Sequence, residues 1–213
     1  YIIRHAEIVY PVDGNGQRLM YPTDTHISNE GRMQITKFAN HLKDRGVRFD
    51  IIEAGPFTRT VETASILATI LGGSEVINPD FTDSFVPGWF GIPLSVQQEI
   101  MDKGEDIYMY PRSEDQEDYE SIADRMLTGF KKVASENVGR TIAIVSHGDP
   151  IRLLMYRLEH PDGDIPNMRV LSRDGYLKRG EAFHVTLGDG GKVIETELVV
   201  GREGTPGKRE TYN

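Results

Sequence analysis

The 213-residue sequence contains no cysteine. Disulfide bonds, thiolate metal sites and a cysteine nucleophile are therefore excluded. A chain without cysteine agrees with a reducing compartment, and we expect the protein to be cytoplasmic. The length corresponds to one domain of ordinary size, which can bury a substantial core without cross-links.

Basic side chains are scarce relative to acidic ones. The chain has 24 Lys and Arg against 33 Asp and Glu, and its formal net charge is −9. Because a nucleic-acid backbone requires clustered positive charge, we expect no nucleic-acid partner. No apolar run approaches the roughly 18 residues of a transmembrane helix, and no segment resembles a signal peptide, so we expect no membrane association. The chain begins inside a predicted strand and without methionine, so we expect further residues upstream.

Short β-prone runs alternate along the chain with segments of helical spacing. Strands are predicted at residues 1–3, 49–54, 76–77 and 140–146, and a hairpin at 180–200. The run at 140–146 is continuously apolar, as in a central strand covered on both faces. After the first strand, an apolar stripe with Ser28 as N-cap predicts a helix. The stripe consists of Ile35, Phe38, Ala39 and Leu42. This alternation predicts an α/β fold.

Three irregular segments interrupt this pattern. Residues 8–26 form a long loop directly after the first strand and are rich in turn signals. Residues 79–120 are irregular and acidic, and we interpret them as a lid or insert region. Residues 201–213 are polar, and we expect them to form a mobile tail. We therefore predict a single domain over residues 1–200.

Arginine and histidine side chains stand where three of the predicted strands end. Arg4 and His5 follow the first strand, His147 follows the central strand, and Arg59 lies shortly after the strand at 49–54. Because the carboxyl ends of parallel strands share one edge of a sheet, we expect these side chains to converge. The helices that follow would point free N–H groups at the same place. Such a cluster of positively charged and N–H groups is suited to binding a small anion, and phosphate fits these groups best.

Several motifs occur in a fixed order between residues 4 and 152. They are Arg4-His5-Ala6 followed by Glu7, Ile27-Ser28-Asn29-Glu30-Gly31, Gly55-Pro56-Phe57-Thr58-Arg59-Thr60-Val61-Glu62-Thr63-Ala64, Glu120-Ser121 with Arg125, and Val145-Ser146-His147-Gly148-Asp149-Pro150-Ile151-Arg152. In this order they resemble the motifs of the histidine phosphatase superfamily, branch 1, which has the phosphoglycerate mutase-like fold. The resemblance implies a three-layer α/β/α sandwich with a mostly parallel central sheet.

The resemblance also implies a mechanism. His5 would attack phosphorus and form a phosphohistidine, which splits one difficult transfer into two easier ones. Arg4, Arg59, His147 and Gly148 would bind the phosphoryl oxygens, where charge is concentrated in the transition state. No cofactor and no metal ion is implied.

A carboxylic acid must protonate the leaving oxygen and later deprotonate the attacking water. In the family this acid usually follows the third strand and precedes a Gly-x-Trp/Phe-x-Gly stretch. Asp83 stands ahead of Gly88-Trp89-Phe90-Gly91, and we therefore assign the role to Asp83. Asp80 is the first alternative, and Glu7 is a more distant one.

One position departs from the family pattern. Six residues after the nucleophile the family often has an asparagine or threonine that contacts phosphate, and this chain has Pro11. Proline has no side-chain donor. Another group in the loop must then supply the contact, and Tyr10 and Asn15 are candidates.

We expect a metal-independent phosphomonoesterase of the histidine acid phosphatase type that acts on a small phosphorylated metabolite. Phosphoglycerate mutase-type transfer and a non-catalytic phospho-ligand-binding regulatory domain are the alternatives. A mutase that retains a bisphosphate would need more basic residues in 92–120 than Lys103 and Arg112, which favours hydrolysis. Specificity is expected to lie in residues 8–26 and 84–120. The sequence leaves a homodimer open and does not identify the substrate.

Overall fold

A computed structural model describes residues 1–172 and 175–200, so the predicted tail at 201–213 lies outside the described residues. The strands of the protein form a six-stranded sheet in the order β3-β2-β4-β1-β5-β6. The strands are β1 (Ile2–Arg4), β2 (Ile51–Ala54), β3 (Ser74–Ile77), β4 (Ile142–Ser146), β5 (Ala182–Leu187) and β6 (Val193–Val199). Over the described ranges, every helix is too short or too polar to cross a membrane.

The four strands β1 to β4 pair in parallel, whereas β5 is antiparallel to β1 and forms a hairpin with β6. Arg4 at the end of β1 is in register with Ser146 at the end of β4. Ala54 at the end of β2 is in register with Val145. The carboxyl ends of β1, β2 and β4 therefore meet at one edge, as the predicted mostly parallel sheet requires.

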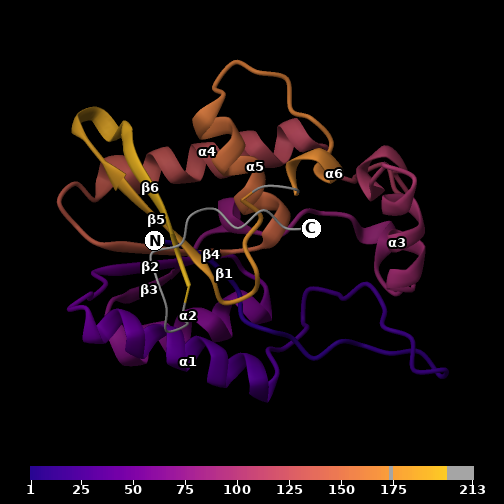
Figure 1. The fold of residues 1–213 in the computed structure, drawn as a ribbon, viewed down its shortest axis with the longest axis horizontal. Coiled ribbons are helices and arrows are strands. Elements are labelled where there is room, and N and C mark those ends of the chain that lie inside the picture. The colour runs from indigo at the N-terminus through magenta and orange to yellow at the C-terminus, as the bar shows by residue number, and fades with distance from the viewer. Residues whose placement is uncertain (173–174, 201–213) are drawn as a thin grey trace.

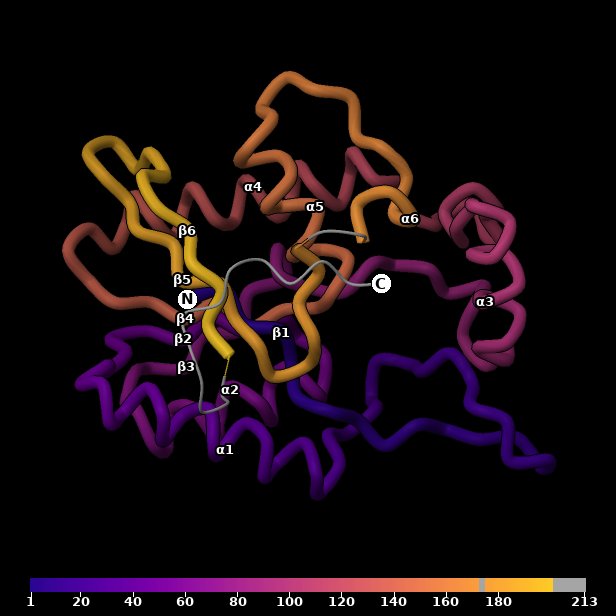
Figure 2. Tube along the Cα trace, in the orientation of Figure 1, coloured from indigo at the N-terminus to yellow at the C-terminus, as the bar shows by residue number. Residues whose placement is uncertain are grey.

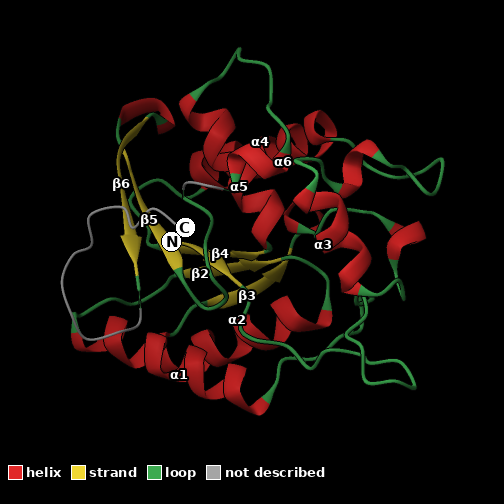
Figure 3. Ribbon diagram, turned by 45° about the vertical axis from the view of Figure 1, so that its right-hand side comes forward, coloured by secondary structure: helices red, strands yellow, loops and turns green. Residues whose placement is uncertain are grey.

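Helices cover both faces of this sheet (Figures 1 and 3). One face carries α1 (Asn29–Asp44) and α2 (Thr58–Leu71), and the other carries α4 (Tyr119–Glu136), α5 (Gly148–Glu159) and the short α6 (Met168–Leu171). Neighbouring residues of β1 point to opposite faces: Ile3 packs in the core under α1 and α2, and Ile2 in the core under α4 and α5. The predicted three-layer α/β/α sandwich is confirmed.

Helix α1 follows its sequence pattern closely. The Ser28 side chain accepts a hydrogen bond from the backbone N–H of Gly31 at 3.0 Å, and the predicted apolar stripe is buried. Glycine is required at position 31, because a Cβ there would lie 2.1 Å from the carbonyl oxygen of Glu7. The same carbonyl accepts a hydrogen bond from the backbone N–H of Ser28 at 2.8 Å. The start of α1 is thereby packed against the chain just after β1.

Helix α2 buries a different face from the one that its apolar residues predict. It begins at Thr58, two residues after Pro56. The apolar pattern predicts a packing face of Val61, Ala64, Ser65 and Ala68. The structure buries Arg59, Thr60, Thr63, Ala64, Leu67 and Leu71. Half of this face is polar and makes internal hydrogen bonds, so apolar periodicity alone misses it.

The irregular segment 79–120 packs against the loop 8–26 at one end of the molecule (Figure 2). It contains α3 (Leu94–Asp102) and short 3₁₀ turns at Pro79–Phe81, Pro87–Trp89 and Ile107–Met109. Trp89, which is 1% exposed, forms a small core with Val86 and Ile107, and Met20 of the loop packs against it. A small separate hydrophobic core therefore joins residues 8–26 to residues 84–120, the two segments expected to determine substrate specificity.

Candidate active site

His5 is the first residue after β1 and is 1% exposed. Its backbone N–H donates to the carbonyl oxygen of Ser146 at 3.0 Å, which extends the pairing of β1 with β4. Its Nδ1 lies 2.8 Å from the carbonyl oxygen of Ala6. That hydrogen bond requires the proton on Nδ1, so Nε2 keeps a free lone pair. His5 lines a cavity at this edge of the sheet, where that lone pair can act as a nucleophile.

Two arginines are held beside His5 by backbone carbonyls. Arg4 donates from Nη1 to Leu177 at 2.7 Å, and its guanidinium lies 5.1 Å from the centre of the Tyr176 ring. Its buried Nε has no hydrogen-bond partner among the described residues. Arg59, at the start of α2, is 1% exposed and donates to the carbonyl oxygen of Pro22 at 3.1 Å. Both cations are fixed in position before any ligand binds.

Arg59 joins Asp83 to His147. Its Nη2 lies 2.6 Å from Asp83 Oδ2, and its Nε lies 3.3 Å from His147 Nδ1. His147 Nδ1 also lies 3.2 Å from Asp83 Oδ2. A neutral His147 therefore carries its proton on Nε2 where Nδ1 accepts from Arg59, and on Nδ1 where it donates to Asp83. Its Nε2 is buried and has no partner in the described part of the chain. As the Nε2–H tautomer or as the protonated ring, His147 would donate from this nitrogen to an anion in the cavity. The His147 ring centre lies 5.1 Å from that of His5.

Burial and neighbouring charges shift the pKa values of His5, His147 and Asp83. Burial, followed by the charges of His147, Arg59 and Arg4, holds the pKa of His5 well below its ordinary 6.5. Burial lowers the pKa of His147 to about 4, although Asp83 acts in the opposite direction. Burial alone would raise the pKa of Asp83, but His147 and Arg59 together bring it well below 3.8. With these shifts the site has two neutral imidazoles and a carboxylate at neutral pH.

These pKa shifts predict that acidification destabilises the protein before its carboxylates titrate. Unfolded histidine binds a proton below about pH 6.5, whereas folded His147 stays neutral down to about pH 4. The stability that each buried neutral histidine contributes is therefore complete above about pH 6.5 and is lost as the pH falls, by about 1.4 kcal/mol per pH unit. Urea unfolding measured at several pH values between these limits gives the slope.

His147→Gln is the variant that tests this prediction, because it should remove one of the two contributions and flatten the slope. His160→Gln is the matched control, since His160 is exposed on the far end of α5. If the slope of stability against pH were the same in both variants and in the wild type, the loss of stability could not be attributed to the buried His5 and His147.

The segment that carries Asp83 is held by α4. Arg125 donates to the carbonyl oxygens of Asp80 and Thr82 at 3.0 Å and of Asp83 at 2.9 Å. Asp83 lines the cavity. The Asp80 side chain instead packs on α4, with its Cβ 2.6 Å from where a Cβ on Gly129 would lie. The structure thus places Asp83 at the site and directs its first alternative away from it.

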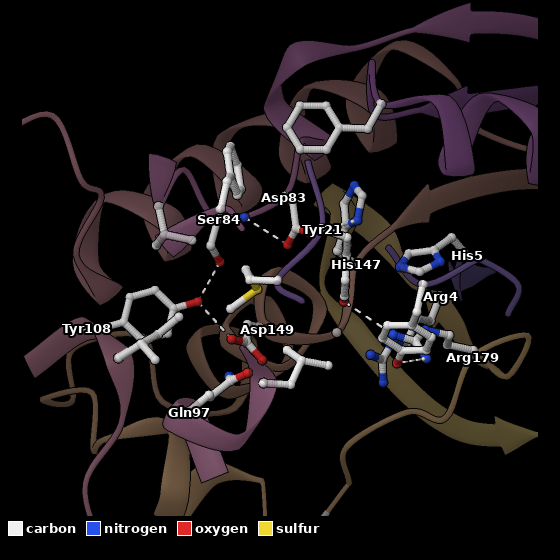
Figure 4. Close-up of a pocket in the computed structure, with 18 of the residues that line it drawn as sticks. Arg4, His5, Tyr21, Asp83, Ser84, Gln97, Tyr108, His147, Asp149 and Arg179 are labelled. Atoms are coloured by element: carbon white, nitrogen blue, oxygen red, sulfur yellow. Dashed lines mark hydrogen bonds and ion pairs between the residues drawn. The ribbon is translucent and has the colours of Figure 1, made fainter. Parts of the chain in front are cut away.

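The cavity has a volume of about 220 Å³ and two chemically different sides (Figure 4). Arg4, His5 and Arg179 lie on one side, and Ser84, Gln97, Tyr108 and Asp149 on the other, with Asp83 and His147 also in view. Apolar side chains complete the lining: Met20, Val86, Phe90, Leu94 and Ile107. No cluster of three or more His, Asp or Glu in residues 1–172 and 175–200 could hold a metal ion.

Gly148 is the first residue of α5 and lines the cavity. The first N–H groups of a helix have no partner within it and favour anions. A Cβ at this position would lie 2.3 Å from the hydroxyl of Tyr176 and 2.9 Å from Cζ of Arg4. Glycine therefore lets both side chains reach the helix start.

Arg179 is a cavity residue that sequence reasoning missed. It donates to the hydroxyls of Tyr10 at 2.6 Å and Tyr21 at 3.2 Å, and to Glu7 at 2.8 Å. Tyr10, one of the two candidates to supply the phosphate contact that Pro11 cannot make, lines the cavity. The other, Asn15, lies in an exposed turn. No local pattern marks Arg179, which stands in the irregular stretch before β5.

Asp149 is a second missed residue and the centre of a hydrogen-bond network. Its Oδ2 accepts from the Tyr108 hydroxyl at 2.7 Å, and its Oδ1 from the Tyr176 hydroxyl at 2.6 Å. The Tyr108 hydroxyl also lies 2.6 Å from Ser84 Oγ. Burial raises the pKa of the Asp149 carboxyl, and both tyrosine bonds lower it. Its place directly after Gly148 was the one available sequence signal.

Comparisons with known proteins agree with this geometry. A family model described as the histidine phosphatase superfamily (branch 1) matches residues 1–174. A broad-specificity phosphatase of Saccharomyces cerevisiae is 23% identical over 209 residues, covering 91% of this chain and 89% of the relative.

Solved structures share the fold. YhfR of Bacillus stearothermophilus has a TM-score of 0.73 at 18% identity, covering 93% of this chain and 94% of its own. A mycobacterial glucosyl-3-phosphoglycerate phosphatase has a TM-score of 0.70 at 19% identity, covering 93% and 95%. At these identities the likeness concerns the phosphoglycerate mutase-like fold alone.

Proposed function

The chain belongs to branch 1 of the histidine phosphatase superfamily, and we propose on this basis that it is a phosphatase that hydrolyses a small phosphomonoester through a phosphohistidine on His5. One observation carries the proposal: a buried His5, with its pKa well below 6.5 and its Nδ1 bonded to the Ala6 carbonyl, lines a cavity together with Arg4 and Arg179. The likeness to a yeast relative named a broad-specificity phosphatase supports the same activity.

In the first step Nε2 of His5 attacks phosphorus while the bond to the leaving oxygen breaks. Arg4 and His147, which line the cavity, and Arg59, which contacts His147 and Asp83, would bind the phosphoryl oxygens together with the N-terminus of α5. Guanidinium groups here provide the positive charge that metal ions provide in many other phosphoryl-transfer enzymes. We therefore propose that the reaction is independent of metal ions.

Asp83 is our proposed proton donor, although its pKa lies well below 3.8 before a substrate binds. A bound phosphoryl group would bring negative charge beside Asp83 and would draw on the same Arg59 and His147 that hold its pKa low. Both changes raise the pKa of the carboxyl. Asp83 would then take up a proton on substrate binding, pass it to the leaving oxygen, and recover it from the attacking water.

Hydrolysis is favoured over mutase-type transfer because the one further arginine among the described residues that line the cavity, Arg179, is already paired with Glu7 at 2.8 Å. Arg112 lies over the Trp89 ring, 4.2 Å from its centre. Lys103 caps the end of α3 and is exposed. Neither residue is among those that line the cavity. A bisphosphate intermediate would lack a second anion site there, so the phosphohistidine would transfer its phosphoryl group to water.

The test is phosphate release by the wild-type protein from p-nitrophenyl phosphate and a panel of phosphorylated metabolites, with and without EDTA. We expect free phosphate from several esters and unchanged rates in EDTA. Conversion of 3-phosphoglycerate to 2-phosphoglycerate without free phosphate would indicate a mutase. Tight binding of phosphorylated ligands without any turnover would indicate a binding domain. Loss of activity in EDTA that magnesium restores would contradict metal independence.

A further inference from the structure

We propose that Asp149 selects the leaving group of the substrate. It accepts hydrogen bonds from hydroxyl groups and repels carboxylates, so the preferred substrates are phosphomonoesters of small polyhydroxy alcohols rather than of hydroxy acids. The inference rests on the proposed phosphatase function and concerns the same cavity.

Asp149 is placed to meet the part of the substrate that leaves. It follows His147 and Gly148 directly and lines the cavity with them. In Figure 4 it lies with Ser84 and Tyr108 across the pocket from His5 and Arg4. A phosphoryl group bound at His5 would therefore extend its alcohol toward Asp149.

The Asp149 carboxylate is held in one orientation and retains acceptor capacity. Tyr108 and Tyr176 each donate to a different oxygen. An ionised carboxylate has about four lone-pair sites, so each oxygen can accept a further hydrogen bond from a ligand. Both tyrosine hydroxyls stay protonated, because burial and the charge of Asp149 raise their pKa well above the ordinary value.

A substrate carboxylate would meet little compensating charge on this side. The lining arginines are Arg4 and Arg179, which lie with His5 in Figure 4. Arg4 also reaches the start of α5 beside Asp149, but the bound phosphoryl group would occupy it. The charge of Arg179 is already paired with Glu7 at 2.8 Å. Because like charges brought together without compensation cost several kcal/mol, the site discriminates against acidic alcohols.

The remaining groups on this side suit hydroxyls. Ser84, Gln97 and Tyr108 are neutral hydrogen-bonding residues, and the apolar lining can pack against a carbon chain. The volume of about 220 Å³ lies below the roughly 300–1,000 Å³ of pockets for drug-sized ligands. These features favour a short polyol over a large or highly charged alcohol.

Glycerol 3-phosphate and 3-phosphoglycerate are the probes, because they differ only in a terminal hydroxymethyl group against a carboxylate. At about pH 8, far above the ordinary pKa of a carboxyl, we expect the wild-type kcat/KM to favour glycerol 3-phosphate by at least about tenfold, the ratio that corresponds to 1.4 kcal/mol. Asp149→Asn keeps the size of the side chain and removes its charge, and it should reduce that ratio by about tenfold. Asp124→Asn on the exposed face of α4 removes the same charge elsewhere and should leave the ratio unchanged.

Each possible result of this experiment either supports or overturns the inference about Asp149. A wild-type ratio near one, or a preference for 3-phosphoglycerate, would overturn the inference even if Asp149→Asn failed to fold. An unchanged ratio in a folded Asp149→Asn, with folding checked by thermal unfolding, would overturn it as well. Turnover of p-nitrophenyl phosphate by the wild type would in both cases leave the phosphatase function standing. Absence of phosphate release from every ester would instead overturn the proposed function and this inference with it.

Discussion

Replacement of His5 by alanine is expected to lower phosphatase turnover by on the order of 10,000-fold or more, as removal of a nucleophile does in other covalent mechanisms. The imidazole is neutral, its Nδ1 is fixed by the Ala6 carbonyl, and its Nε2 is free in the cavity. Alanine leaves the surrounding arginines in place, so phosphate binding should persist while transfer stops. The measurement combines initial rates on p-nitrophenyl phosphate with labelling by a radioactive substrate and an alkaline quench, which preserves phosphohistidine.

His160→Ala is the matched control, because His160 is exposed at the end of α5. It should retain both turnover and labelling. The nucleophile would have to be sought elsewhere if His5→Ala kept more than about a tenth of wild-type turnover, since removal of a nucleophile costs far more than tenfold. Persistent labelled protein in that variant would point to the same conclusion.

Replacement of Asp83 by asparagine is expected to have an effect that depends on the leaving group. General acid catalysis contributes about 100- to 10,000-fold, and we expect a loss of this size for an alkyl phosphate, whose alkoxide must be protonated. The loss should be much smaller for p-nitrophenyl phosphate, because nitrophenolate leaves without a proton. Asparagine can still accept the hydrogen bond from Arg59, so the guanidinium should remain in place.

Asp80→Asn provides the control that separates the two candidate acids. Asp80 lies three residues earlier, and its side chain packs on α4 rather than lining the cavity. Its turnover should therefore stay close to that of the wild type on both esters. Equal losses on both esters in Asp83→Asn would assign Asp83 to holding Arg59 rather than to proton transfer. Full turnover in that variant would remove Asp83 from the mechanism altogether.

The α/β class followed from features that act locally along the chain. Strand-prone and helical spacings alternate, and the N-cap Ser28 with its apolar stripe specifies α1. Parallel pairing then carries the residues after β1 and β4 to one edge, so the proximity of His5 to His147 is a consequence of strand order. The α/β class and the shared sheet edge needed only patterns within single elements and the general geometry of parallel sheets, whereas the pairing of β1 with β4 is a property of the folded sheet.

The choice between Asp80 and Asp83 could not be made in the same way. Both stand in an irregular segment, where no period sets the direction of a side chain. Arg125 of α4 sets the path of that segment through three backbone carbonyls. The direction of each aspartate therefore depends on a contact with a distant helix.

The sequence by itself determined the α/β class and the histidine that follows each of the two central strands, because hydrophobic spacing and strand ends are properties of short segments. The three-layer sandwich was implied by the family motifs. Only the tertiary structure decided which polar side chains complete the cavity. The buried face of α2 turns Arg59 inward toward His147, and packing of separate loops brings Arg179 and Tyr176 to the same place. The positions of these groups are fixed by hydrogen bonds between segments far apart in the chain, which no local pattern can encode.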